Sequence, residues 1–364
     1  MVQLLPALAS GGVERSTLEV AEALVRAGHR SIVISAGGRL VECLLQAGSE
    51  HINLDIGRKS LLTLRHVFSL RRLFAELRPD IVHARSRLPA WLGLLALRGY
   101  RQQPRPHFIT TVHGLNSPGW YSGVMTRGER VVCVSQTVRD HVLAQWPGID
   151  QEKLVVIERG ISPKAFEHGQ SVNPDWRRRW EAEFPALAGG KLLLLPGRGT
   201  RLKGHAAAIE LLAAIRARGV DARLWLLGTR ERGREDYVRE LETLAQSLGV
   251  APFLAISAPR GDIPLAYAQS DLVLQLSERP EAFGRTVLEA LSVGRPVLGW
   301  ALGGVGEQLR RLFPSGAVIA GDHAALLARA LELLDNPHPA IPPMPDTLTV
   351  MQEKILKVYE SLVV

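Results

Sequence analysis

The sequence has few cysteines and no apolar run long enough to cross a membrane. Its two cysteines, Cys43 and Cys133, lie far apart in apolar patterns, so we expect buried free thiols and not a disulfide framework. The longest apolar stretch, residues 88–97, is too short for a bilayer and contains Pro89 and Gly93. The first residues also do not have the pattern of a secretory signal peptide. A cytoplasmic protein is the expectation.

Several sequence motifs that would point to other enzymes are missing. The first predicted strand is not followed by Gly-x-Gly-x-x-Gly, and the second ends at Ser35 without an acidic residue, which disfavours a dinucleotide-dependent oxidoreductase. There is no Walker loop and no Gly-x-Ser-x-Gly elbow. No His, Cys or Asp cluster has the spacing of metal ligands, so we expect no metal and no cofactor.

The charge is distributed unevenly along the chain. Residues 1–165 contain 21 basic and 13 acidic residues and so hold the whole net charge of +8, while the remainder is balanced. Such a field favours a polyanion, an anionic membrane leaflet or a phosphorylated acceptor. Aromatic residues make up only 5% of the chain and we find no nucleic-acid-binding motif, so nucleic acid is a poor candidate partner.

Short apolar stretches alternate with helical patterns along the whole chain. A length of 364 residues suits two domains. The alternation predicts an α/β protein with open parallel sheets, each covered by helices on both faces. In the first domain we expect strands at residues 2–8, 31–35, 81–83, 108–112 and 130–134; in the second, at 192–195, 223–227, 253–256, 271–276, 296–298 and 317–319.

Domain boundaries follow from composition. We expect an N-terminal domain over residues 1–165, a linker with a short helix over 166–189, and a C-terminal domain over 190–346. The final helix, 347–362, has an apolar face and must pack on something. A further helix over 61–77 is predicted to have an apolar side that includes Leu61, Leu64 and Phe68, with basic residues reaching outward.

Two loops carry residues suited to a phosphorylated sugar ligand. Arg198 and Lys203 lie in a Gly-rich loop directly after a predicted buried strand, and a planar guanidinium with a compact ammonium suits a diphosphate. Glu281 lies just before a predicted helix that opens at Phe283, and Glu289 lies inside it. The ordinary alternatives are a solvated basic loop and two surface carboxylates.

These residues form a pattern that resembles a known family. Glu281 and Glu289 form a Glu-x7-Glu pair with Phe-Gly between them; Glu-Ala, Gly-x-Pro-Val and the Gly303-Gly304 loop follow. This signature resembles the GT-B glycosyltransferases of family 4, the group 1 glycosyltransferases. The resemblance implies two Rossmann-like domains facing each other across a cleft that holds the active site, with the final helix returning to the first domain.

The resemblance also implies roles for residues of the second domain. Arg198 and Lys203 match the family's Gly-Arg…Lys-Gly element, whose side chains hold the donor diphosphate. Glu289 corresponds to the residue that accepts hydrogen bonds from the ribose, and Glu281 to the one that orients a sugar hydroxyl. The backbone N–H groups of Phe283 and Gly284 are expected to face the donor.

Residues of the first domain have implied roles too. Gly11 and Gly12 match the family's N-terminal glycine loop, and His113 matches a histidine beside the donor sugar. Arg85 and Arg87 end another strand and are candidates for acceptor contacts, although a solvated basic loop is as good a reading. One departure is Arg159, where the family often has Asn.

The implied activity is retaining transfer of a hexose-type sugar from a nucleotide diphosphate sugar, with UDP favoured, to a glycan or lipid-linked acceptor such as a lipopolysaccharide core. No Asp-x-Asp motif is present, and the two cations replace a metal in this reading. An anionic membrane surface, to which the protein would bind peripherally, is a candidate partner. The alternatives are a non-catalytic nucleotide-sugar-binding subunit and another GT-B enzyme such as an epimerase or a phosphorylase.

Overall fold

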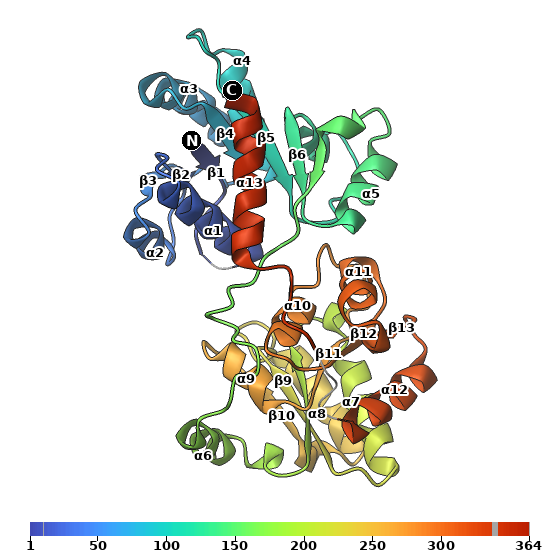
Figure 1. Cartoon of the computed structure of the whole chain (residues 1–364). Coiled ribbons are helices and arrows are strands. Elements are labelled where there is room, and N and C mark those ends of the chain that lie inside the picture. Colours follow the sequence, from blue (N-terminus) through green and yellow to red (C-terminus); the bar gives the residue numbers. More distant parts are fainter. Residues whose placement is uncertain (10, 337–340, 364) are drawn as a thin grey trace. The chain divides into compact units, whose positions relative to one another are not determined.

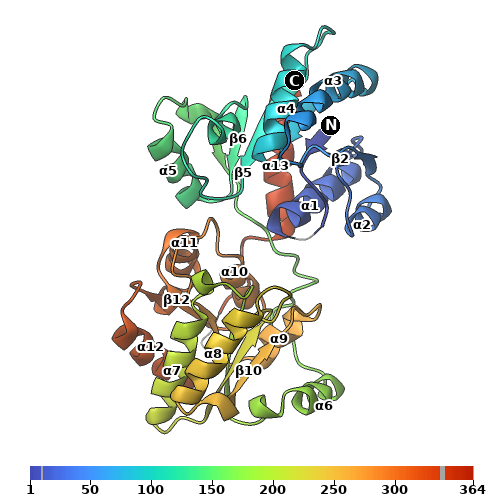
Figure 2. The same cartoon turned by 180° about the vertical axis from the view of Figure 1, so that it is seen from behind.

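The computed structural model describes residues 1–9, 11–336 and 341–363. The chain divides into two compact units, drawn in Figure 1 and from behind in Figure 2. The first unit comprises Met1–Gly160 together with the final helix α13 (Leu348–Val363), and the second comprises Ile161–Thr347. Part of the Pro-rich stretch 337–345, at the end of the predicted C-terminal domain, lies outside the described residues.

The first unit contains a seven-stranded parallel sheet. Its spatial order is β3-β2-β1-β4-β5-β6-β7, so the order reverses between β1 and β4. The buried strands are short and apolar, as expected when helices cover both faces of a parallel sheet. The strands are β1 (Val2–Leu4), β2 (Ile32–Ser35), β3 (Glu50–Asn53), β4 (Ile81–Ala84), β5 (His107–Val112), β6 (Arg130–Cys133) and β7 (Leu154–Val156).

Helices cover both faces of this sheet. Helices α1 and α13 lie on one face, and α3 and α4 lie on the other, as the two views in Figures 1 and 2 agree. Helix α4 packs closely because Gly93 has no side chain: a Cβ there would lie 2.7 Å from Leu4 Cδ1. The helices are α1 (Gly12–Arg26), α2 (Val41–Gln46), η1 (Leu61–Arg65), α3 (His66–Leu77), α4 (Arg87–Arg98), η2 (Ser122–Thr126), α5 (Gln136–Gln145) and η3 (Gln151–Lys153).

The final helix completes the core of the first unit. Apolar side chains of α13 pack with α1 and with β4, β5 and β6; those of α13 are Met351, Ile355, Val358 and Tyr359. Tyr359 is buried, which raises the pKa of its phenol, and its hydroxyl lies 2.7 Å from His83 Nδ1. The other ring nitrogen of His83 lies 2.7 Å from Thr111 Oγ1. Residues 276 positions apart are therefore joined inside one core.

The second unit repeats the architecture with six parallel strands. The order is β10-β9-β8-β11-β12-β13, so here the reversal falls between β8 and β11. Both units are therefore doubly wound, Rossmann-like domains, as the alternation of elements predicts. The strands are β8 (Lys191–Pro196), β9 (Ala222–Leu227), β10 (Leu254–Ser257), β11 (Leu272–Gln275), β12 (Val297–Trp300) and β13 (Ala317–Val318).

The helices of the second unit connect these strands. They are α6 (Pro174–Glu183), η4 (Pro185–Leu187), η5 (Arg201–Lys203), α7 (His205–Ala217), α8 (Glu235–Ser247), η6 (Ala251–Phe253), α9 (Ile263–Gln269), α10 (Arg285–Ser292), α11 (Gly303–Leu312), η7 (Pro314–Gly316) and α12 (His323–Asp335).

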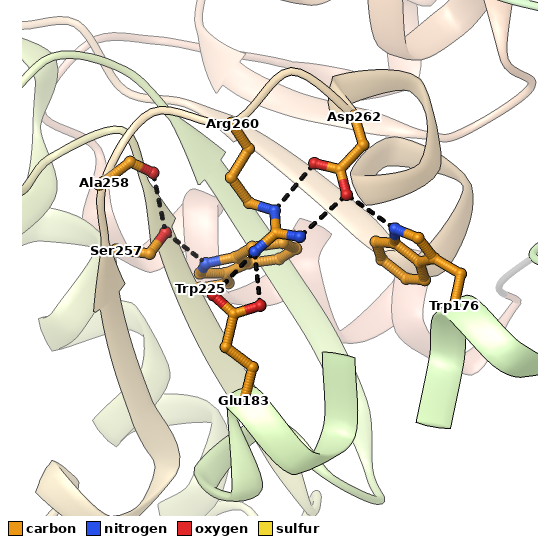
Figure 3. A network of polar contacts seen from close by, with 7 residues as sticks. All are labelled: Trp176, Glu183, Trp225, Ser257, Ala258, Arg260 and Asp262. Atoms are coloured by element: carbon orange, nitrogen blue, oxygen red, sulfur yellow. Dashed lines mark hydrogen bonds and ion pairs between the residues drawn. The ribbon is translucent and has the colours of Figure 1, made fainter. Parts of the chain in front are cut away.

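The segment predicted as a linker, 166–189, is packed into the second unit. Trp180 is almost fully buried, with its ring centroid 5.6 Å from that of Trp225 in β9. Figure 3 shows Arg260 joining this segment to the loop between β10 and α9: its guanidinium bonds Glu183 of α6 at 2.7 Å and Asp262, before α9, at 2.8 Å. The Pro, Gly and charged residues of the segment predict a linker. Composition does not reveal that Trp180 packs on the sheet at Trp225 and that Trp176 stacks on Trp180.

Two further expectations are wrong in detail. Cys133 is buried, which raises its thiol pKa to about 12, but Cys43 is exposed on the short helix α2. The predicted helix 61–77 begins as the 3₁₀ helix η1 and becomes α-helical only at His66. The buried face of the segment is formed by Thr63, Val67, Leu70 and Phe74. Leu61, Leu62 and Phe68 lie off this face and are 86%, 73% and 70% exposed.

Among the described residues, no helix is both long enough and apolar enough to cross a bilayer.

The bond between α13 and β4 gives a test of the first unit. Tyr359→Phe removes the hydroxyl that pairs with His83 and leaves a buried ring nitrogen without its partner. We expect the free energy of unfolding of this unit to fall by about 1–3 kcal/mol, measured by urea denaturation. Val363→Ala, on the exposed end of the same helix, is the control and should change it by less than about 0.5 kcal/mol. Equal stability of both variants would mean that the bond contributes nothing.

Candidate functional site

In the second unit the candidate residues follow the two strands at which the strand order reverses. In the first unit Gly11 and Arg85 follow two such strands, β1 and β4, but His113 follows β5. In the second unit, the loop with Arg198 and Lys203 follows β8, and the loop with Glu281 follows β11, the neighbour of β8. Open α/β sheets bind ligands beyond the carboxyl ends of strands at this position. The topology therefore brings together two loops that are about eighty residues apart in the sequence.

Backbone contacts fix these two loops against each other. Gly204 has φ +74°, and a Cβ there would lie 2.0 Å from the carbonyl oxygen of Leu276, so only glycine fits. The N–H of Glu278 donates to the carbonyl of Leu202 at 3.0 Å. As a result Lys203 Nζ lies 2.6 Å from Glu281 Oε1, and Ser277 Oγ also donates to that carboxylate oxygen.

The Lys203–Glu281 pair is partly accessible to solvent, at 27% and 25% of the two side chains. Arg198 lies exposed in the same loop, at the carboxyl end of β8. One ammonium, one guanidinium and one carboxylate thus border the same strand ends. This arrangement can bind an anionic group and a hydroxyl group side by side.

The glycines around Glu281 make room for protein backbone. Gly284 has φ +87°, caps α10, and a Cβ there would lie 2.9 Å from Val305 Cα. The N–H of Gly304 donates to the carbonyl of Glu281 at 2.7 Å, so the start of α11 lies directly on the loop. Phe283 is buried. The Phe-Gly and Gly-Gly elements therefore pack α10 and α11 together, in addition to any ligand contact.

Glu289 lies on α10 and is 9% exposed. Its carboxylate accepts hydrogen bonds from Arg285 Nε at 2.7 Å and from the Tyr267 hydroxyl at 2.9 Å. Burial, together with the nearby carboxylate, raises the pKa of Tyr267, so this phenol stays a donor. Sequence reasoning missed both partners, although Arg285 stands four residues before Glu289, the spacing of neighbours on one helix face.

In the first unit, His113 follows β5 and contacts Arg159. The Arg159 guanidinium donates to His113 Nδ1 and to Ser16 Oγ on α1. Burial, then the charge of Arg159, lowers the pKa of His113 well below its usual range. The ring is therefore neutral, and because Nδ1 accepts, its hydrogen is on Nε2. That buried Nε2 has no partner among the described residues.

Arg159 therefore belongs with His113 in the candidate site. From the sequence, Arg159 was notable only because it departs from the family pattern. It stands after β7, far from His113 in sequence, and only the folded sheet brings the two together.

The two arginines proposed for acceptor contacts differ from each other. Arg85 is 3% exposed and its guanidinium donates to Gln3, Thr111 and the carbonyl of Ser16. It holds the core together, so its assignment as an acceptor contact is wrong. Arg87 is half-buried at the start of α4, lies over the Tyr121 ring at 5.4 Å and donates to Ser122.

The glycine loop lies at the start of α1. Gly11 is the N-cap residue, with φ +138°, and Gly12 is the first helical residue. A Cβ on Gly11 would meet the Glu14 carboxylate at 2.6 Å, whereas a Cβ on Gly12 would meet no atom within 4 Å. The open space beside Gly12 and the unpaired N–H groups of a helix start suit an anion.

The described part of the chain contains no group of three or more His, Cys, Asp and Glu side chains placed to hold a metal ion. The accessible strand ends of the second unit carry positive groups that include Arg198, Lys203 and the backbone N–H groups of helix starts.

Comparisons with known proteins match nearly the whole chain. A sequence model described as Glycosyltransferase Family 4 matches residues 10–165, and one described as Glycosyl transferases group 1 matches residues 177–343. Spore coat protein SA of Bacillus subtilis is 27% identical over 232 residues, which are 60% of this chain and 59% of that protein. The chain spans about half the length of the relatives that it matches by sequence.

Solved structures have the same fold. A glycosyltransferase from Rickettsia africae has a TM-score of 0.85 and 27% identity, with 100% of this chain and 98% of that chain covered. Anabaena Alr3699/HepE, solved with UDP and glucose, has a TM-score of 0.80 and 21% identity over 99% of both chains. The fold and both sequence models agree: this chain belongs to the group 1 glycosyltransferases with the GT-B fold.

Proposed function

We propose that the protein transfers a hexose from a nucleotide diphosphate sugar to a hydroxyl of a glycan or lipid-linked glycan, with retention at the anomeric carbon. The observation that carries this proposal is the Lys203–Glu281 pair at the strand-order reversal of the second unit, with Arg198 beside it. UDP is the favoured nucleotide, because the structural relative from Anabaena binds UDP and glucose.

In this proposal the cations stabilise the leaving group. The bond between the anomeric carbon and the diphosphate oxygen breaks as the acceptor oxygen bonds to that carbon from the same face, and the leaving phosphate takes the acceptor's proton. Negative charge grows on the diphosphate, and Arg198, Lys203 and the N–H groups at the start of α10 neutralise it without a metal. Lys203 also holds Glu281 in place, and that carboxylate orients a hydroxyl of the sugar.

Glu289 is proposed to bind the ribose. Each of its carboxylate oxygens already accepts one hydrogen bond, from Arg285 or Tyr267, and each has a second lone pair to accept a ribose hydroxyl. The two protein donors fix the carboxylate orientation before the nucleotide arrives.

His113 is proposed to donate from Nε2 to a hydroxyl of the donor sugar. Its neutral state and hydrogen position follow from Arg159, which occupies Nδ1. A buried N–H without a partner is costly, and a sugar hydroxyl would satisfy it.

Loss of either cation tests the diphosphate assignment. With UDP-, GDP- and ADP-sugars offered in turn, the wild type should hydrolyse or transfer from one of them. Arg198→Ala and Lys203→Ala should each slow that reaction by about 100- to 1,000-fold, the usual cost of losing a charge partner of the transition state. Arg218→Ala, at an exposed helix end of the same unit, is the control and should retain full turnover.

Near wild-type rates in both variants would remove the assignment. If the wild type binds a nucleotide sugar but never turns it over, the chain is the non-catalytic binding subunit instead.

Chelation tests the metal-independent mechanism. If the side-chain cations and helix N–H groups neutralise the negative charge of the leaving diphosphate, EDTA should leave the turnover rate within about twofold of that of the untreated enzyme, since no bound metal ion would be lost. The rate is measured after dialysis against EDTA and again after adding Mg²⁺ or Mn²⁺. An absolute requirement for either ion would contradict the mechanism.

We further propose that the acceptor is anionic and lies at a membrane surface, as in a lipid-linked glycan or a lipopolysaccharide core. Two observations support a membrane-binding patch at η1 and the start of α3. Its exposed apolar side chains are Leu61, Leu62, Leu64 and Phe68, and its exposed basic residues are Arg58, Lys59, Arg65 and Arg72. Apolar side chains flanked by cations are typical of segments that lie in the interface of an anionic leaflet.

Vesicle sedimentation tests this membrane-binding patch. The protein should bind vesicles of phosphatidylglycerol with phosphatidylcholine but not phosphatidylcholine alone, and binding should fade as salt rises. The triple variant Leu61→Ser, Leu62→Ser, Phe68→Ser should bind at least tenfold more weakly. Leu248→Ser with Ile319→Ser, which removes exposed apolar residues of the second unit, is the matched control. Equal binding to both lipids, or to neither, would favour a soluble acceptor.

A further inference from the structure

A cavity of about 640 Å³ lies within the first unit, away from the candidate donor residues. Three of the seven tryptophans of the chain line it: Trp91, Trp120 and Trp146. Its volume is within the range of about 300–1,000 Å³ typical of small-molecule sites, and such sites combine aromatic walls with a few polar groups.

The position of the cavity separates it from the strand ends described above. Most of its wall comes from residues 123–127, which lead into β6, and from residues 146–153, which lead into β7. These segments lie toward the amino ends of the strands, whereas His113 and Gly12 lie beyond the carboxyl ends. The rest of the wall includes Trp91 of α4 and Trp120 of the connection between β5 and β6.

The aromatic wall is held in place by the protein. Trp91 Nε1 donates to the carbonyl of Tyr121 at 3.0 Å, and the Trp91 and Trp120 rings pack edge to face at 5.3 Å. Trp146 packs edge to face with His141 at 6.4 Å, and its Nε1 lies against Gly123, where a Cβ would come within 3.1 Å. Two indoles are therefore fixed before any ligand arrives.

Trp120 is different, because 78% of it is exposed. Burying a large aromatic side chain is favourable, so a tryptophan held open at the mouth of a cavity indicates a binding surface. Around it stand Arg127, Lys153 and Asp150. The side chains of Arg127 and Lys153 form no ion pair with any described residue, so their donors are available to a ligand.

We propose that this cavity, the tryptophan pocket, binds an oligosaccharide segment remote from the reacting sugar. The apolar C–H faces of pyranose rings pack on flat indole rings, and Arg127, Lys153 and Asp150 bond the hydroxyl or acid groups around the ring edges. The pocket would hold the acceptor chain several sugars from the hydroxyl that reacts, so the enzyme would favour long acceptors over short ones. The choice of a glycan as the ligand rests on the proposed function. The presence of the pocket does not depend on that function.

Binding is measured without donor, by fluorescence anisotropy of three end-labelled hexasaccharides: maltohexaose, N-acetylchitohexaose and hexagalacturonate. At least one should bind the wild type saturably. Trp120→Ala and Arg127→Ala, both at exposed positions, should weaken that binding at least tenfold. Leu45→Ala, at a 52% exposed apolar position of the same unit, is the control and should leave it unchanged. Binding of hexagalacturonate alone would show that Arg127 and Lys153 recognise acid groups.

The inference is overturned if none of the three hexasaccharides binds, or if Trp120→Ala and Arg127→Ala bind with wild-type affinity. Donor hydrolysis, measured separately, should be the same in Trp120→Ala and the wild type. Hexasaccharide binding without any nucleotide-sugar turnover would contradict the proposed function but support glycan binding by the tryptophan pocket. Turnover without hexasaccharide binding would support the proposed function and contradict glycan binding by the pocket.

Discussion

Two parallel sheets that reverse their strand order place the functional residues of this protein. A strand order of 3-2-1-4 makes the helices after strands 1 and 4 cross to opposite faces, which opens space beyond the carboxyl ends of those strands. In the second unit that space lies beyond β8 and β11 and brings Lys203 to Glu281. In the first unit it lies beyond β1 and β4, where the start of α1 and Arg85 meet.

The polar groups at these strand ends divide into a supporting set and an accessible set. Arg85, His83 and Thr111 satisfy one another and Tyr359 inside the first unit, so they fix the strands. Arg198, Lys203 and Glu281 remain partly or fully open to solvent. A buried cation needs several fixed acceptors, whereas a cation that binds a ligand must keep donors free. That difference separates Arg85 from Arg198, although both follow buried strands.

Much of the fold could be predicted from the pattern of apolar stretches. The strands of the second unit fall within a few residues of their predicted positions, because a strand buried on both faces is a continuous apolar run. The short β3 has no such run, and β7 has one of only four apolar residues, 154–157; neither is among the predicted strands. The segment 166–189 was misassigned because its two buried tryptophans lie among charged residues.

The sequence by itself determined the fold class, the family and the segments that carry Arg198, Lys203, Glu281 and Glu289. Short apolar strands and local motifs consist of residues that are close together along the chain, so they can be recognised without the structure. The tertiary structure alone decided which side chains meet. Arg159 reaches His113 across 46 positions, and Arg85 is enclosed by groups from β1, β5 and α1. Leu61 and Phe68 face outward because the segment packs on the protein through Val67, Leu70 and Phe74 instead. Three tryptophans line one cavity because the strands between them in the sequence, β5 and β6, pair with each other, and β6 pairs with β7. The spacing of the tryptophans along the chain does not predict this pairing.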